Sequence, residues 1–185
     1  MARVITFSRV YPSYHPKAGQ PTHFVEKLWN AHNAHTLDEE FFMPFEDDVW
    51  ELNKSLPYET VQDFLKSLAI RWEIKPKMHT IRAGKRWKEG DRASFRVWSG
   101  KPYASKQIII MPEVTICQVL DIEIDVMSNV YINGEKNQLS EFVDMLAEND
   151  GLTRTDLFHW FNKLPFSGQI IFQHNSPKSY SECLT

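Results

Sequence analysis

The clearest pattern in the chain is an alternation of apolar and acidic residues between positions 120 and 126. The apolar positions are Leu120, Ile122, Ile124 and Val126, and the acidic positions between them are Asp121, Glu123 and Asp125. A period of two places successive side chains on opposite faces of a strand. The segment therefore predicts a strand with one buried face and one face in water.

Further strands are expected in segments rich in β-branched and aromatic residues. These segments are Val4 to Phe7, Arg92 to Trp98, Lys106 to Met111, Glu113 to Gln118 and Gly168 to His174. Pro112 separates two of them, because proline cannot donate a hydrogen bond to a neighbouring strand.

Two helices are expected in the first part of the chain. Thr22 is a candidate cap for a helix whose apolar face consists of Phe24, Val25, Leu28, Trp29 and His32. Thr60, with Asp63 three residues later, is the expected start of a second helix. The apolar stripe of this helix consists of Val61, Phe64, Leu65, Leu68, Ala69 and Trp72.

Two more helices are expected near the end of the chain. The first runs from Ser140 to Glu148 and stops before Gly151, which suits a left-handed helix end. The second begins at Thr153, with Asp156 three residues later, and runs through Phe161. Helices and strands do not alternate regularly, so we expect an α+β fold with a mainly antiparallel sheet or a small barrel.

Composition places the chain among globular proteins. Its 185 residues have a mass of 21.7 kDa, and 42% of them are hydrophobic, which favours one domain with a substantial core. No apolar run reaches the roughly 18 residues that a membrane helix needs, and the start does not resemble a signal peptide. We therefore expect a cytoplasmic protein with no membrane partner, whose Cys117 and Cys183 are free thiols.

Charge is concentrated in one segment. Between residues 75 and 106 there are ten Lys or Arg and two acidic residues, a net charge of +8, whereas the rest of the chain has a net charge of −11. A basic segment of this kind attracts phosphate groups and other polyanions. Ordinary solvated surface charge is the alternative.

The usual cofactor and metal motifs are absent from the sequence. It has no Walker loop, no dinucleotide-binding glycine motif and no nucleophile elbow. Of the seven histidines, His32 and His35 alone have helical i, i+3 spacing, without a third ligand nearby. We expect no cofactor and no metal.

Separate blocks of the chain resemble the ASCH domain, a member of the PUA-like superfamily of small β-barrels. The blocks are the Lys-x-x-Thr-Ile-Arg core that begins at Lys77, the Trp-Lys-x-Gly-Asp sequence that ends at Asp91, and Ala147 to Thr153 before a helix with Trp160 and Phe161. Compact members lack a counterpart of residues 33 to 74. The resemblance implies a single ASCH domain over residues 1 to 185, with a helical insertion at about 33 to 74 that caps one rim of the barrel.

One branch of this family, the bacterial amidohydrolases that act on N4-acetylcytidine, is similar at three positions. The resemblance places the catalytic lysine at Lys77, the threonine nucleophile at Thr80 and the carboxylate at Asp150, where the branch has a glutamate that is one methylene longer. A threonine hydroxyl needs a base to take its proton, and a lysine that nearby cations push toward neutrality can act as that base. Each of the three also has an ordinary structural interpretation, as a solvated lysine, a strand threonine and a helix end.

The segment from Trp98 to Lys106 combines aromatic, small and cationic residues. A base in single-stranded RNA stacks on aromatic rings, and lysines contact its phosphates. A hairpin tip with Trp98 in the core is the alternative. The candidate ligand-binding residues are Arg82, Arg86, Trp98, Lys101, Tyr103 and Lys106.

Three functions are therefore open. The first is binding of RNA or a modified nucleoside in a basic, aromatic cleft that contains these residues together with Lys77, Thr80 and Asp150. The second is amide hydrolysis, which needs the Lys77 amine and the Thr80 hydroxyl within hydrogen-bond reach of each other. The third is a ribonuclease that stabilises the transition state with cationic side chains and without a metal.

Overall fold

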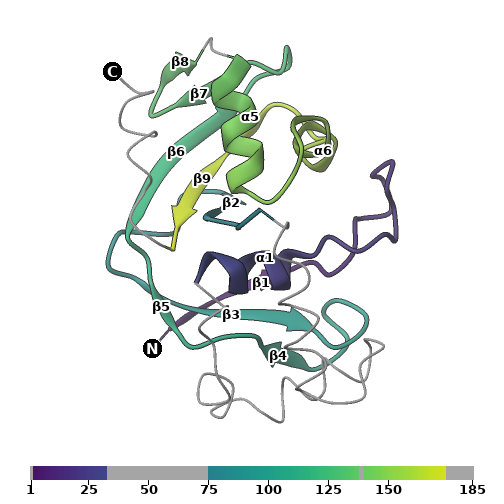
Figure 1. Ribbon diagram of the computed structural model, residues 1–185. Coiled ribbons are helices and arrows are strands. Elements are labelled where there is room, and N and C mark those ends of the chain that lie inside the picture. The colour runs from purple at the N-terminus through teal and green to yellow at the C-terminus, as the bar shows by residue number, and fades with distance from the viewer. Residues whose placement is uncertain (1, 33–74, 138–139, 174–185) are drawn as a thin grey trace. The chain divides into compact units, whose positions relative to one another are not determined.

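The computed structural model describes residues 2–32, 75–137 and 140–173 (Figure 1). These residues divide into two compact units. The first contains residues 2–11, 19–32, 75–76 and 92–114, and the second contains residues 12–18, 77–91, 115–137 and 140–173. The second helix expected in the first part of the chain, and the insertion from 33 to 74 to which it belongs, lie outside the described residues.

The first unit is built on a small mixed sheet. Its strands are β1 (Arg3–Phe7), β3 (Arg92–Trp98) and β4 (Gln107–Ile109), and β5 (Val114–Thr115), at the end of this unit, also pairs with β3. β1 runs parallel to β3, with Ile5 opposite Phe95, and β4 runs antiparallel to β3, with Val97 opposite Ile108. All four of these side chains are buried, so paired apolar positions form the core of the sheet.

Helix α1 (Phe24–Ala31) supplies the rest of this core. It buries Phe24, Val25, Leu28 and Trp29, as the apolar spacing predicts. The Trp29 indole donates from Nε1 to the Ile110 carbonyl oxygen over 2.6 Å, which fixes the helix to the chain beyond β4. The expected cap is wrong by one residue.

The residue that caps α1 is His23, which has a positive φ and makes no side-chain cap hydrogen bond. Thr22 is buried instead. Its hydroxyl donates to the Ser8 carbonyl oxygen and accepts from the Phe24 amide. Thr22 therefore anchors the chain in front of the helix.

The second unit contains an antiparallel sheet in the order β2-β9-β6-β7-β8. These strands are β2 (His79–Ala83), β6 (Gln118–Ile124), β7 (Val130–Ile132), β8 (Glu135–Asn137) and β9 (Phe166–Phe172). β9 lies between β2 and β6, so Ile170 has Ile81 on one side and Leu120 on the other. The last strand in the described part of the chain is therefore the one that joins β2 to the rest of the sheet.

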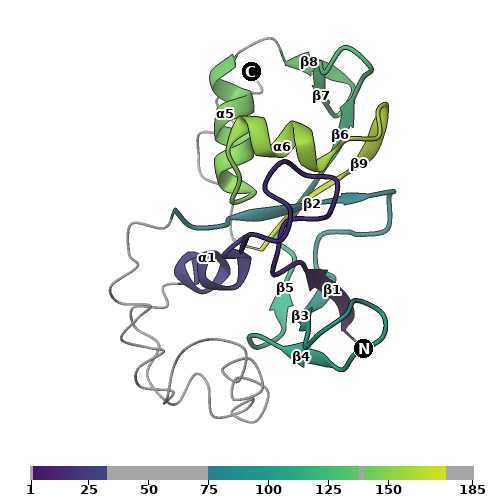
Figure 2. The same cartoon turned by 90° about the vertical axis from the view of Figure 1, so that its right-hand side faces the viewer.

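Two helices accompany this sheet, α5 (Ser140–Asn149) and α6 (Arg154–Trp160). In Figures 1 and 2, α5 lies across one face of the sheet. Its buried side chains are Phe142, Val143, Leu146 and Ala147. The predicted cap of α6 is confirmed, because the Thr153 hydroxyl accepts from the Asp156 amide over 3.1 Å.

The alternating segment behaves as predicted for most of its length. Leu120, Ile122 and Ile124 are buried, whereas Glu123 is exposed. Val126 is an exception, with 68% of its surface exposed, because β6 ends at Ile124 and the chain turns immediately afterwards.

The predicted α+β class with mainly antiparallel pairing is confirmed, although several strand boundaries are wrong. The segment Glu113 to Gln118 is not one strand: Val114 and Thr115 form β5, and Gln118 begins β6. β9 begins at Phe166, two residues before its expected start. The strands β2, β7 and β8 are additions to the predicted set.

No helix in the described part of the chain is long and apolar enough to cross a membrane. Cys117 is a half-buried free thiol that donates to the Thr115 carbonyl oxygen over 3.5 Å. Cys183 lies outside the described residues.

Gly168 is a position where packing requires glycine, which gives a test of the second unit. A Cβ atom at this position of β9 would clash with the Arg82 carbonyl oxygen and lie 2.7 Å from Cζ of Phe166. We expect Gly168→Ala to lower the free energy of unfolding by about 1 to 3 kcal/mol, the usual cost of overpacking. Urea denaturation measures this change. Gly100→Ala is the control, because its Cβ would meet only ordinary contacts at 3.6 Å; an equal effect at both positions would contradict the prediction.

Candidate functional site

The turn after helix α5 positions the Asp150 carboxylate in the second unit. The Asp150 amide donates to the Leu146 carbonyl oxygen, and the Leu152 amide donates to that of Ala147. Gly151 between them has a φ of 77°, a left-handed conformation that favours glycine. The helix end expected at this glycine is confirmed, and it fixes the backbone that carries Asp150.

Lys77 and Asp150, which are 73 residues apart in the chain, form a buried ion pair. Lys77 Nζ lies 2.8 Å from Asp150 Oδ1 and also donates to the Asp150 carbonyl oxygen. The Lys77 side chain is 1% exposed. A lysine buried to this extent needs a carboxylate partner, because an isolated charge is very costly to remove from water. Two of the three residues matched to the amidohydrolases are thus brought together.

The edge of β2 completes the environment of Asp150. The Ile81 amide donates to Asp150 Oδ1 over 3.1 Å. Before β2 begins, the Met78 amide donates to the Asn149 carbonyl oxygen. The end of α5 and the start of β2 are therefore joined by main-chain and side-chain bonds, and the carboxylate occupies one position.

His79 is the third ionisable group of this cluster, and the sequence analysis did not select it. Its side chain is 0% exposed, and its Nδ1 lies 3.6 Å from Asp150 Oδ1. The ring packs edge-on against Phe172, with 5.1 Å between ring centres. The signal was the position of His79 inside the Lys-x-x-Thr motif, whereas the sequence analysis considered histidines only as metal ligands.

Burial and charge shift both titrations in this cluster. Burial lowers the pKa of the His79 imidazole below its ordinary value of 6.5, and the nearby Asp150 carboxylate offsets this only in part. Burial alone would raise the pKa of Asp150, but the Lys77 charge and the His79 contact outweigh it and hold that pKa below 3.8. The cluster therefore consists of an ammonium, a carboxylate and a neutral imidazole.

Gln173 is a second residue that the sequence analysis missed. It is buried, and its Nε2 donates to the Lys77 carbonyl oxygen. Among the described residues, no donor bonds its Oε1. The amide thus holds the backbone of Lys77 from the end of β9, and no local motif around position 173 marks this role.

Thr80 is buried in β2 opposite Ile171. Neighbouring residues of a strand point to opposite faces, so the Thr80 and His79 side chains leave the strand on different sides. The Lys77 amine donates to two oxygens of Asp150. The nucleophilic role of Thr80 stays a prediction.

Arg82 and Arg86 lie on either side of the turn that follows β2. Arg82 is half-buried and Arg86 is exposed. Gln169 of β9 organises this turn, because its Oε1 accepts from the amides of Arg86 and Trp87, and its Nε2 donates to the Trp87 carbonyl oxygen. The arginines are therefore presented by an ordered backbone.

The remaining candidates belong to the first unit, in the hairpin loop between β3 and β4. Tyr103 is 90% exposed, and its ring centre lies 5.4 Å from that of Trp98. The Ser105 hydroxyl accepts from the Gly100 amide and donates to the Lys101 carbonyl oxygen, which orders the loop. The segment is a hairpin tip, as the alternative interpretation expected, but Trp98 is half-buried and does not lie fully in the core.

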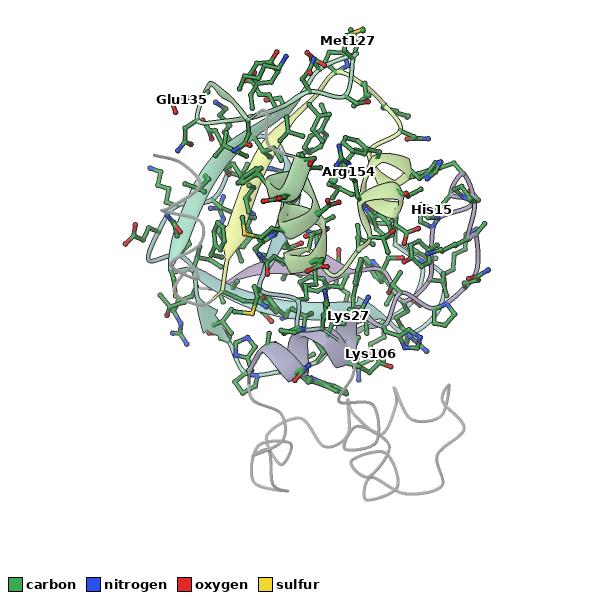
Figure 3. The ribbon with its side chains drawn as sticks, turned by 45° about the horizontal axis from the view of Figure 1, so that its top comes forward. His15, Lys27, Lys106, Met127, Glu135 and Arg154 are labelled. Carbon is green, nitrogen blue, oxygen red and sulfur yellow. The ribbon has the colours of Figure 1, made fainter. Side chains whose placement is uncertain are left out.

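The two exposed lysines Lys101 and Lys106 flank Tyr103 in the chain (Figure 3 labels Lys106). The second unit holds Lys77, Thr80, Arg82, Arg86 and Asp150, whereas the first unit holds Trp98, Lys101, Tyr103 and Lys106. A single cleft that contains both groups stays a prediction. Within the ranges that the structure covers, no group of three His, Cys, Asp or Glu side chains could hold a metal ion.

The lowered pKa of His79 makes stability depend on pH. The unfolded chain binds a proton at His79 near pH 6.5, whereas the folded chain does so only at a lower pH. We therefore expect the free energy of unfolding to decrease as the pH falls from 7 to 5. The slope of this decrease approaches about 1.4 kcal/mol per pH unit. Asp150, whose folded pKa is depressed, adds a further loss only below about pH 4.

Urea denaturation of the wild type and of His79→Gln at several pH values measures this contribution. The variant should show a shallower decline over the same range. Parallel curves for the two proteins would show that His79 titrates alike in both states and would contradict the assignment.

Comparisons of the chain with models of protein families, with curated proteins and with solved structures find no match.

Proposed function

We propose that the chain binds single-stranded RNA or a modified nucleoside, with the loop between Trp98 and Lys106 as a stacking surface. The observation that carries this proposal is the exposure of Tyr103, whose ring is 90% exposed beside Trp98. An aromatic ring left in water by the fold offers a face on which a base can stack. We expect the base to lie on Tyr103 and to gain contact with Trp98.

The charges around the loop suit the same ligand. Lys101 and Lys106 are exposed in the loop, and an ammonium group on either side of a stacked base can contact the adjoining phosphates. The backbone of the loop is held by Ser105, so binding does not require the whole loop to be ordered first.

The resemblance to ASCH domains belongs to this proposal. We infer that the two sheets are parts of one PUA-like barrel, that residues 1 to 185 form a single domain, and that the protein meets its ligand in the cytoplasm. The motif residues Lys77, Thr80 and Asp150 are buried, which argues against interpreting them as residues of a solvated strand and helix end.

Replacement of Tyr103 tests the stacking surface directly. A base stacked on an aromatic side chain contributes about 1 to 3 kcal/mol, so Tyr103→Ala should weaken the binding of labelled single-stranded RNA by about fivefold to 150-fold. Tyr103→Phe keeps the ring and should bind almost as the wild type does. Fluorescence anisotropy titrations at several salt concentrations measure both effects, and affinity should fall as salt rises.

Tyr14→Ala is the control for loss of an exposed tyrosine, because Tyr14 lies in the second unit and is 52% exposed. Equal losses in Tyr103→Ala and Tyr14→Ala would contradict a specific role for the loop. An affinity that does not change with salt would rule out phosphate contacts.

A second candidate function is hydrolysis of the amide in N4-acylated cytidine, and the observation that favours it is the contact between the motif residues Lys77 and Asp150. In this proposal Lys77 first gives up its own proton and acts as a neutral amine. That amine takes the Thr80 proton, the Thr80 oxygen attacks the acyl carbon, and the proton passes to N4 as the carbon–nitrogen bond breaks. Water then releases the acyl group from Thr80. Asp150 holds the Lys77 amine in place through the 2.8 Å contact.

Incubation with N4-acetylcytidine, with chromatography for cytidine, tests this second candidate. Thr80→Val has nearly the shape of threonine without its hydroxyl and should abolish turnover, whereas Thr80→Ser should retain part of it. Lys77→Met should lower turnover by about 10²-fold to 10⁴-fold, the range for loss of a general base. Circular dichroism checks folding, because an unpaired Asp150 costs about 3 to 5 kcal/mol of stability.

Absence of turnover in the wild type, or unchanged turnover in Thr80→Val, would contradict the hydrolase. Either result would leave the stacking proposal intact, because Tyr103 and Thr80 lie in different units.

A further inference from the structure

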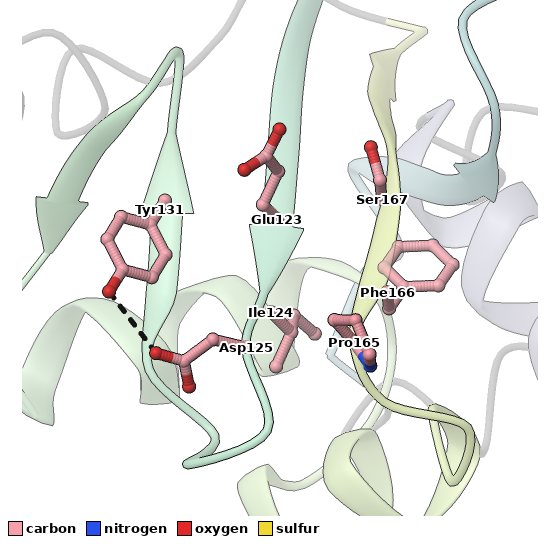
Figure 4. Close-up of a pocket in the computed structure, with 7 residues that line it drawn as sticks. All are labelled: Glu123, Ile124, Asp125, Tyr131, Pro165, Phe166 and Ser167. Carbon is pink, nitrogen blue, oxygen red and sulfur yellow. Dashed lines mark hydrogen bonds between the residues drawn. The ribbon is translucent and has the colours of Figure 1, made fainter.

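A small pocket opens at one end of the five-stranded sheet, and none of the candidate site residues lines it. Its volume is about 270 Å³, and it is lined by Glu123, Ile124, Asp125, Tyr131, Pro165, Phe166 and Ser167 (Figure 4). All of these residues belong to the second unit. Drug-sized ligands occupy pockets of about 300 to 1,000 Å³, so this one suits a side chain or a small amine.

The register of three strands places the polar part of the pocket on one face. Glu123 lies directly opposite Ser167 of β9 and opposite Tyr131 of β7. Residues opposite each other in neighbouring strands project from the same face of a sheet. Figure 4 shows Glu123 and Ser167 pointing to the same side. The Glu123 carboxylate and the Ser167 hydroxyl therefore lie on one side of the strands, whereas the Tyr131 hydroxyl is directed to Asp125.

The three acidic residues of β6 and its turn differ in how far they are already engaged. Asp121 pairs with Lys85 at 2.6 Å. Asp125 accepts from the amides of Met127 and Asn129 and from the Tyr131 hydroxyl, the last over 3.2 Å. Among the described residues, none donates a hydrogen bond to the Glu123 carboxylate. Glu123 is thus the carboxylate with capacity for a ligand.

Asp125 adds a second negative charge to the pocket. The hydrogen bonds from Asn129 hold the pKa of the Asp125 carboxyl below its ordinary value, so this group is ionised at neutral pH. Removal from water and the neighbouring Asp125 carboxylate raise the pKa of the Tyr131 phenol, so it stays a neutral donor. A metal ion would need several free oxygen ligands, whereas the Asp125 oxygens already accept donors from its own turn.

The other walls of the pocket are apolar or aromatic. Ile124, Pro165 and the Phe166 ring can contact an aliphatic stem, and the rings of Phe166 and Tyr131 attract a cation at their faces. We propose that this pocket binds a primary ammonium group on an unbranched aliphatic stem, with the ammonium on Glu123. The ligand is either a free diamine or the side chain of a lysine in a partner protein.

The chain itself provides a precedent for this chemistry on the same face of β6. Lys85 reaches Asp121, two residues before Glu123, and forms an ion pair there. The Glu123 charge also acts on Lys85 and contributes to its raised pKa. An ammonium group bound at Glu123 would form a second ion pair of this kind, two residues further along β6.

Calorimetric titration of the full chain tests this proposal. The probes are 1,5-diaminopentane for a free amine, an N-acetylated and C-amidated lysine for a peptide side chain, and 1,5-pentanediol as the neutral analogue. We expect at least one cationic probe to bind with a Kd below about 5 mM, and the diol not to bind. The cation that binds identifies the source of the ligand.

Matched variants locate the binding. Glu123→Gln should weaken it by about fivefold, and Glu123→Lys should abolish it because the new ammonium group repels the ligand. Glu135→Gln makes the same charge change at an exposed position of β8 outside the pocket (Figure 3) and should change affinity by less than about twofold.

Three results would overturn the proposal. These are no binding of either cation to the wild type, binding of the diol as tight as that of the amine, and equal losses in Glu123→Gln and Glu135→Gln. Circular dichroism should show that the variants fold, because Glu123 is exposed. The outcome is independent of RNA binding, which involves a ligand of opposite charge.

Discussion

Removing an ammonium group from water is so costly that its partner must be fixed in place, and this constraint governs the second unit. Lys77 is paired with Asp150, so the segment before β2 and the turn after α5 must meet. The Met78 and Ile81 amides bond to Asn149 and Asp150. The edge strand β2, the end of α5 and the buried ion pair therefore hold one another in place, and His79 is buried among them.

The parts of the fold that the sequence predicted are those set by periodicity. β6 and β3 have long alternating or β-branched segments, and α5 and α6 have recognisable ends. The hairpin of β7 and β8 was missed although Asn133 and Gly134, both with positive φ, form the Asn-Gly turn typical of hairpins. β2 was missed because its burial comes from partners that are distant in the chain.

The candidate site, too, contains residues that the sequence predicted and residues that depend on contacts between distant parts of the chain. Motif resemblance selected Lys77 and Asp150, and the structure brings them together. It could not select Gln173, whose contact with the Lys77 backbone depends on the pairing of β2 with β9. Tyr103 was selected for its residue type, but neither its positive φ nor its exposure in the loop is specified by composition.

The position of β9 in the sheet also affects how the protein is made. β9 is the last strand of the described chain, yet it separates β2 from β6. Among the described strands, β2 pairs only with β9, so during synthesis this pairing waits until residues 166–172 have left the ribosome. Pairing between segments so far apart is slow because a long loop must close first. The sheet is therefore completed late, and the apolar edges of β2 and β6 are exposed to chaperones and to other chains until then.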